Sequence, residues 1–194
     1  MSKHNERADG EIHEDQLLNF LVNTLTGAFG LSLGENADLD LEDIYEVLVS
    51  ATADGTSIST LCERGNDAPP STDVLYHLRT KLDLDTVKPV GNTLLQEYTL
   101  DVLPEQVEIV VDLHLRPYYG DEDDTDGLYY SEAKHGTTAF HAYATLYARV
   151  RNKRYTLAVR RLTDGDIASG VLAEFLSLLD RLEFEVKVPR FAAS

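Results

Sequence analysis

One stretch, residues 108–116, limits the folds open to this chain more than any other. It reads Glu-Ile-Val-Val-Asp-Leu-His-Leu-Arg, an apolar run followed by alternating polar and apolar residues. This pattern is typical of a strand that is buried at its start and half-exposed at its end. Because side chains alternate across a strand, one face carries Val110, Asp112, His114 and Arg116. An acid in a central strand is costly unless it is hydrogen-bonded or binds a cation. Two interpretations of Asp112 therefore stay open, a solvated strand end and a cation site.

The charge balance is strongly acidic. The chain has 194 residues with 34 acidic and 17 basic side chains, a net charge of -17. Such a surface repels nucleic acid at low salt, or it belongs to a high-salt interior where the screening length is a few ångströms. Many Asp residues, few Lys residues and no Trp favour the second explanation. We therefore expect a halophilic protein.

Composition also excludes several classes. Cys62 is the single cysteine, so a disulfide within the chain and a cysteine-based zinc site are excluded. No apolar run is long enough to span a bilayer, and the polar N-terminus lacks the core of a signal peptide. We expect a cytoplasmic protein without membrane contacts.

The chain divides into a tail and two regions. Residues 1–11 are expected to be a disordered tail, and residues 12–104 a helical region that ends at a joint near Pro104. Residues 105–194 form the second region. Apolar spacing predicts helices over 12–28, 40–53, 57–65, 74–82 with a cap at 71–73, and 85–100.

The third and fourth predicted helices follow each other across a short turn, which is the outline of a helix-turn-helix motif. The contact face of such a motif would carry His77, Arg79 and Lys81. A plain three-helix bundle, with Arg79 and Lys81 as solvated charges, explains the same pattern. Both interpretations stay open.

The second region alternates strands and one helix. Strands are expected over 108–116, 139–150, 155–162 and 184–188, and a helix opened by residues 163–166 should run to residue 182. The acid-rich stretch 121–127 is expected to be a solvated hairpin loop.

Basic side chains recur from residue 149 to residue 161 without any acid. They form either a hairpin that balances acids elsewhere or a patch that contacts phosphates. The candidate DNA contacts of this region are Arg116, Lys134, Arg149, Arg151, Lys153 and Arg154.

The order of elements indicates a mixed α+β or α/β chain. Three strands joined by hairpins, a crossover helix and a strand parallel to the first form the opening half of a ribonuclease-H-like fold. We therefore expect a helix-turn-helix-like region followed by an incomplete β-β-β-α-β half-domain. In that architecture carboxylates near the first strand hold two metal ions for attack on a phosphodiester.

Residues 110–120 and 134–145 together resemble DDE transposases of haloarchaeal insertion sequences. The resemblance implies that Asp112 is the first of three catalytic acids that bind Mg²⁺ or Mn²⁺. It also implies that the helical region binds the DNA of element ends, and that intact relatives cleave and transfer DNA strands.

The chain departs from that family at its end. The family has a second Asp after the fourth strand and a later Glu, whereas this sequence continues from Glu185 to Ser194 without another acid. We expect a truncated transposase that binds metal weakly and is inactive alone. One alternative is a DNA-binding regulator that binds the element ends and blocks a full-length transposase. The other is a fragment that has no selected role or acts only through protein contacts. The expected partners are DNA and either a full-length transposase or further copies of this chain in a homo-oligomer.

Overall fold

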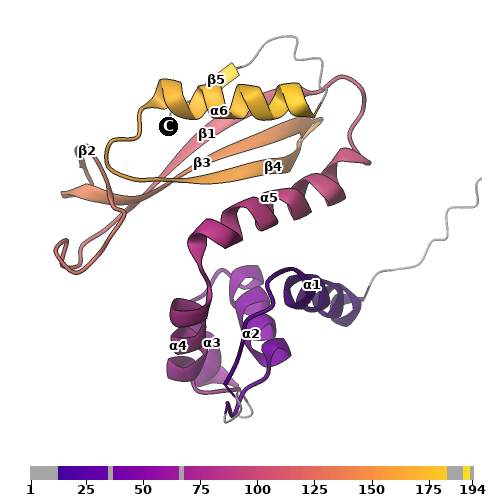
Figure 1. Ribbon diagram of the computed structural model, residues 1–194, viewed down its shortest axis with the longest axis vertical. Coiled ribbons are helices and arrows are strands. Elements are labelled where there is room, and N and C mark those ends of the chain that lie inside the picture. The colour runs from indigo at the N-terminus through magenta and orange to yellow at the C-terminus, as the bar shows by residue number, and fades with distance from the viewer. Residues whose placement is uncertain (1–12, 35–36, 66–67, 183–189, 193–194) are drawn as a thin grey trace, which may run out of the picture. The chain divides into compact units, whose positions relative to one another are not determined.

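The computed structural model describes residues 13–34, 37–65, 68–182 and 190–192 (Figure 1). The chain divides into two compact units, Met1–Val87 and Lys88–Ser194. The predicted tail, residues 1–11, and the predicted strand over 184–188 lie outside the described residues. Within the described residues, no helix is long and apolar enough to cross a membrane.

The described residues of the first unit form helices α1 (Glu14–Ala28), α2 (Leu41–Ala53), α3 (Ile58–Arg64) and α4 (Ser71–Lys81). Helix α2 packs against α1, α3 and α4. The buried side chains form two clusters, one around Tyr45 and one around Ile44. Adjacent residues of α2 therefore serve two separate cores.

Local capping explains where these helices begin. The Asp40 side chain accepts the backbone N–H of Asp43 at 2.9 Å, and the Asp43 side chain accepts the backbone N–H of Asp40 at 3.1 Å. Ser57 caps α3 by accepting the N–H of Thr60. These bonds satisfy donors that a helix start otherwise leaves unpaired.

Helix α4 corrects one expectation. Residues 71–73 were expected to cap the helix, but they form its first turn, and Pro70 is the N-cap. The backbone N–H groups of Asp73 and Val74 donate to the Pro70 carbonyl. Proline fits this position because its fixed φ agrees with a helix start.

Helix α5 (Leu84–Leu100) crosses the division between the units. Asp83 opens it by accepting the N–H of Asp85 and the hydroxyl of Thr86. The part of α5 that belongs to the second unit binds the backbone of strand β4 (Lys153–Leu162) through three polar side chains at helical spacing. Asn92 exchanges two hydrogen bonds with Val159, Gln96 donates to Leu157, and Thr99 donates to Thr156. These bonds satisfy main-chain groups that a strand edge otherwise leaves open.

The sheet of the second unit contains β1 (Glu108–Pro117), β2 (Tyr129–Lys134), β3 (Thr137–Val150), β4 and β5 (Arg190–Ala192). Strand β3 is antiparallel to β1, β2 and β4, and β5 is parallel to β1. The order is β2-β3-β1-β5, with β4 also paired to β3. The chain is therefore a mixed α/β protein with its helices concentrated at the N-terminal side.

Strand β2 was not predicted. The strand expected over 139–150 begins at Thr137 as β3, and His135 and Gly136 form a tight turn between β2 and β3. Both have positive φ, 53° and 84°, which matches the twist of a two-residue hairpin.

Helix α6 (Ala168–Arg181) covers one face of the sheet (Figure 1). Its residues Val171, Phe175 and Leu179 are buried against the strands. The facing residues of β3 include Ala142 and Ala144, and their small side chains let the helix approach closely. Residues 163–166 were expected to open this helix, but its N-cap is Ile167, which is 66% exposed.

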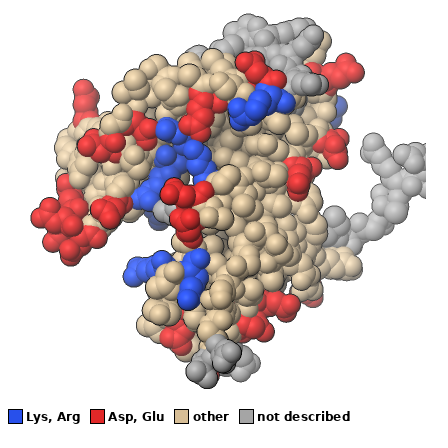
Figure 2. Space-filling model, viewed as in Figure 1, with Lys and Arg blue, Asp and Glu red and all other residues tan. Residues whose placement is uncertain are grey.

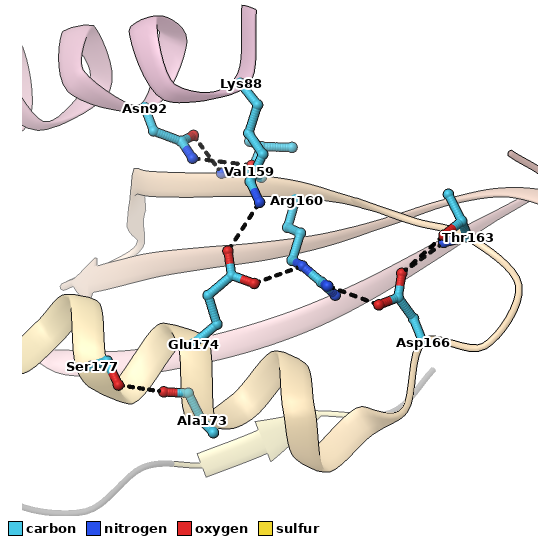
Figure 3. Close-up of polar contacts among 9 residues, drawn as sticks. All are labelled: Lys88, Asn92, Val159, Arg160, Thr163, Asp166, Ala173, Glu174 and Ser177. Carbon is cyan, nitrogen blue, oxygen red and sulfur yellow. Dashed lines mark hydrogen bonds and ion pairs between the residues drawn. The ribbon is translucent and has the colours of Figure 1, made fainter. Parts of the chain in front are cut away.

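An ionic network ties α6 to its neighbours (Figure 3). Arg160 of β4 lies 2.7 Å from Asp166 and 2.7 Å from Glu174, and Lys88 of α5 lies 3.0 Å from Glu174. Asp166 also accepts the backbone N–H of Thr163 at 2.8 Å. That bond, followed by Arg160, lowers the pKa of the Asp166 carboxyl below its usual range, although burial acts in the opposite direction.

Candidate functional site on the open face of the sheet

Asp112 lies in the middle of β1. Its register partners are Thr145 on the antiparallel strand β3 and Ala192 on the parallel strand β5. The Asp112 side chain is 14% exposed and is therefore largely buried. It points away from α6, because Val111 and Leu113 on either side pack toward the α6 core.

Two nitrogen-bearing side chains lie close to the Asp112 carboxylate. His114 Nε2 is 3.3 Å from Oδ2, and a terminal nitrogen of Arg154 is 3.9 Å from the same oxygen. The Arg154 guanidinium also lies over the Tyr147 ring, 5.1 Å from its centroid. An aromatic face attracts a cation electrostatically, so Tyr147 helps to hold Arg154 beside Asp112. The carboxylate therefore has a positive neighbour, although the Arg154 side chain is 66% exposed.

These residues do not by themselves fit a two-metal site. In the described ranges there is no group of three or more His, Cys, Asp or Glu side chains that could hold a metal ion. Asp112 offers one carboxylate and His114 one imidazole, whereas Mg²⁺ prefers several oxygen ligands. The Arg154 charge also competes with a cation for Oδ2. The weak metal binding expected from the sequence stays a prediction.

The predicted contacts of the helical region lie toward the end of α4. Arg79 and Lys81 are exposed, and His77 is half-buried. His77 and Lys81 line a hollow of about 430 Å³ together with Tyr76, but Asp38 and Asp73 line it too. The hollow is therefore of mixed charge, and Arg79 does not line it among the described residues.

The predicted contacts of the sheet do not share one environment. Arg149 lies on the face of Asp112, but Glu108 binds it at 2.6 Å and compensates its charge. Arg116 lies on the same face and is exposed. Arg151 occupies the β3–β4 turn with φ 55°, and exposed Lys153 and Lys134 lie at the ends of β4 and β2.

Figure 2 shows acidic side chains gathered at the left of the second unit, where Figure 1 places the loop between β1 and β2. This loop contains the acid-rich stretch 121–127, whose acids are exposed. Tyr118 braces the loop, because its hydroxyl lies 2.6 Å from the Thr125 hydroxyl and donates to the Asp121 carbonyl. The expectation of a solvated loop agrees with this exposure.

Two residues that were not singled out as site residues lie on the face of Asp112. His141 is paired in register with Arg116, and Arg161 is paired in register with Tyr143. Burial, and then the charges of Arg161 and Arg116, lowers the pKa of the His141 imidazole below its usual range. The alternation of residues 141–149 in the sequence indicates which of them share one face of the sheet. The cross-strand neighbours of His141 and Arg161 depend on strand register, which the sequence does not show.

Comparisons with protein-family models, with curated protein sequences and with solved structures found no match. The site geometry described above therefore carries the functional argument.

Proposed function

We propose that this chain is a DNA-binding protein related to DDE transposases, with a ribonuclease-H-like second unit. The observation that carries the proposal is the parallel pairing of β5 with β1 after the α6 segment, in register at Asp112 and Ala192. Antiparallel β1, β3 and β4 precede that pairing. This order and the place of Asp112 in β1 support the proposed relationship.

In this proposal, the helical unit contacts duplex DNA through α4. The support is the succession of α2, α3 and α4 in mutual contact, with Arg79 and Lys81 exposed in the last turn of α4. Exposed cations gain affinity for DNA by releasing counterions from the phosphates. The ligands are the ends of an insertion sequence.

The proposed activity is DNA binding. Strand cleavage would require further metal-binding acids in addition to Asp112. The support is the local chemistry of that carboxylate, which has an imidazole and a guanidinium as neighbours within 4 Å. A DNA-binding chain without its own two-metal site would act on transposition by occupying the element ends.

A binding assay tests the proposed function. Fluorescence anisotropy in 1 M KCl would compare duplexes from the DNA flanking the gene with a scrambled duplex of equal length. We expect tighter binding to the flanking duplex and about a tenfold weaker affinity for the double variant R79Q/K81Q, because each lost phosphate contact costs affinity. Arg64→Gln is the matched control, since Arg64 is an exposed cation at the end of α3.

Equal affinity for the scrambled duplex would contradict the proposed function, as would an equal loss in Arg64→Gln. A separate nicking assay with Mg²⁺ or Mn²⁺ checks the assignment of Asp112. We expect no cleavage by this chain alone. Metal-dependent cleavage that disappears in Asp112→Asn would show that Asp112 belongs to a working catalytic site.

A further inference from the structure

The open face of the sheet contains a positive cluster in a strongly acidic chain. Arg116 on β1 lies directly across from His141 on β3, and Arg161 on β4 lies directly across from Tyr143. His141 and Tyr143 are two residues apart and therefore point to the same side of the sheet. Directly opposed residues have Cβ atoms about 5 Å apart. The two arginines thus flank His141 and Tyr143 from opposite sides.

The charges of these two arginines are not compensated by described carboxylates. Arg161 donates from Nη2 to the backbone carbonyls of Asp126 and Gly127 at 2.9 and 3.0 Å. Those carbonyls orient the guanidinium without cancelling its charge. Among the described ion pairs none includes Arg116 or Arg161, whereas nearby Arg149 is bound by Glu108.

His141 is held in a defined position between them. The Tyr118 ring packs edge-on against the imidazole with 5.1 Å between centroids. The other groups facing His141 are Arg116 and His114 from β1 and Arg161 from β4, while Tyr130 of β2 is paired with Ala139, two residues away. Arg161 and Arg116 are the charges that hold its pKa low, after burial. Burial, and then the charges of Glu122, Asp164 and Asp123, raises the pKa of the Tyr130 hydroxyl.

We propose that Arg116, His141 and Arg161 form an oxyanion site that binds a phosphate group. Guanidinium groups match phosphate geometry and charge, and an imidazole between two cations gains a partner when an anion arrives. Tyr143 is 39% exposed beside the cluster and offers a ring face for stacking. A phosphate next to an exposed aromatic ring suits single-stranded DNA, whose bases stack on such side chains.

The inference that the cluster binds a phosphate group rests on the geometry of the sheet alone. The inference that this phosphate belongs to DNA rests on the proposed function. The experiment separates them by titrating the full chain, in KCl without phosphate buffer, with inorganic phosphate in one arm and with a short oligothymidylate in the other. The readout in both arms is the nuclear magnetic resonance signal of the His141 imidazole. This signal localises binding to the sheet, so DNA bound by the helical unit does not affect the conclusion.

We expect both ligands to shift the His141 signal and to raise its pKa by about one unit, because a bound anion favours the imidazolium. Arg116→Gln and Arg161→Gln should each weaken both ligands at least fivefold. Two separate variants are used because Arg161 also binds the loop at Asp126 and Gly127. Tyr143→Leu should weaken the oligothymidylate but leave inorganic phosphate unchanged. Arg181→Gln, an exposed cation in the last turn of α6, should change neither.

If inorganic phosphate binds but oligothymidylate does not, the oxyanion site is supported, and the inference that its ligand is DNA is overturned. Absence of a His141 response to both ligands would overturn the site itself, as would equal weakening by Arg181→Gln. None of these outcomes depends on Arg79 or Lys81, so a failed oxyanion site and a failed helical DNA contact remain distinguishable.

Discussion

Arg160 and Arg161 are consecutive residues of β4, yet their guanidinium groups bind opposite kinds of partner. Arg160 lies 2.7 Å from the carboxylates of both Asp166 and Glu174. Arg161 binds the neutral carbonyls of Asp126 and Gly127. Strand alternation directs the two side chains to opposite faces of the sheet. The charge of Arg160 is therefore used within the fold, and that of Arg161 is left for a ligand.

Replacing Asp166 with Asn should destabilise the second unit. The carboxylate binds the Thr163 N–H and Arg160, so its neutralisation should lower the free energy of unfolding at pH 7 by about 1–2 kcal/mol. The folded-state pKa of Asp166 lies below its unfolded value of 3.8, so the stabilisation is complete above that value. It is lost as the pH falls through the folded-state pKa, and the difference between wild type and variant should narrow in acid.

Urea denaturation at pH 7 and at acid pH, both in KCl, measures this difference. Asp180→Asn is a control, because Asp180 is an exposed acid near the end of α6, whereas Asp166 lies in the loop before that helix. It should change stability by less than about 0.5 kcal/mol. If the difference in the free energy of unfolding between wild type and Asp166→Asn stays the same in acid, the stabilisation does not come from the ionised Asp166 carboxylate.

Asn92→Ala should weaken the hydrogen bonding between α5 and the backbone of β4. The Asn92 amide accepts the Val159 N–H at 2.8 Å and donates to the Val159 carbonyl at 3.2 Å. Loss of both bonds leaves a half-buried peptide unit unpaired and should cost about 1–3 kcal/mol. Native-state hydrogen exchange at Val159 measures the effect, and protection should fall. Thr93→Ala, which removes only a bond to the Pro89 carbonyl in the same helix, should leave that protection intact.

Two glycines offer a matched test of the Arg161 position. Gly127 and Gly165 have φ +72° and +86°, so alanine at either site is strained by roughly 1 kcal/mol. A Cβ at Gly127 would lie 2.8 Å from a terminal nitrogen of Arg161, whereas nothing lies within 4 Å of a Cβ at Gly165. Gly127→Ala should therefore also displace Arg161 and reduce phosphate binding at least twofold. Equal phosphate affinity in the two variants would contradict this role of Gly127.

The acidic surface predicts a stability that rises with salt. A net charge of -17 repels itself, and the screening length falls from about 10 Å at 0.1 M to about 3 Å at 1 M salt. We expect Tm to increase by several degrees between 0.1 and 2 M KCl, measured by differential scanning fluorimetry. An uncharged osmolyte at matched osmolality is the control, because it leaves charge repulsion unscreened. A Tm that is constant or falls with KCl would argue against a halophilic protein.

The helices and most strands could be predicted from the sequence. Apolar spacing placed α1, α2, α3 and α6 within a few residues of their observed bounds, since each helix buries one continuous stripe. Strand β2 escaped prediction because it is short, mostly exposed and follows an acid-rich loop. The sequence signal for this hairpin was the pair His135-Gly136. Both residues have positive φ in the structure, as a two-residue turn of this kind requires.

The candidate site was predicted only in part. Asp112 stood out because a carboxylate interrupts an apolar strand, and its low exposure of 14% agrees with that reasoning. Arg154 stays a predicted DNA contact, and its position 3.9 Å from Asp112 was not expected from the sequence. His141 and Arg161 belong to strands that the sequence predicted. The sequence did not show which residues of the neighbouring strands lie opposite them.

The sequence by itself determined the acidic charge, most of the elements and the faces of the strands that it predicted, because periodicity is a local property of the chain. Only the tertiary structure decided which faces meet. The pairing of Arg116 with His141 and of Tyr143 with Arg161 depends on register, and a shift by one residue would turn one strand's side chains to the other face. Arg160 is compensated because α6 and the loop before it bring Glu174 and Asp166 near its guanidinium, whereas the register leaves Arg161 on the other face.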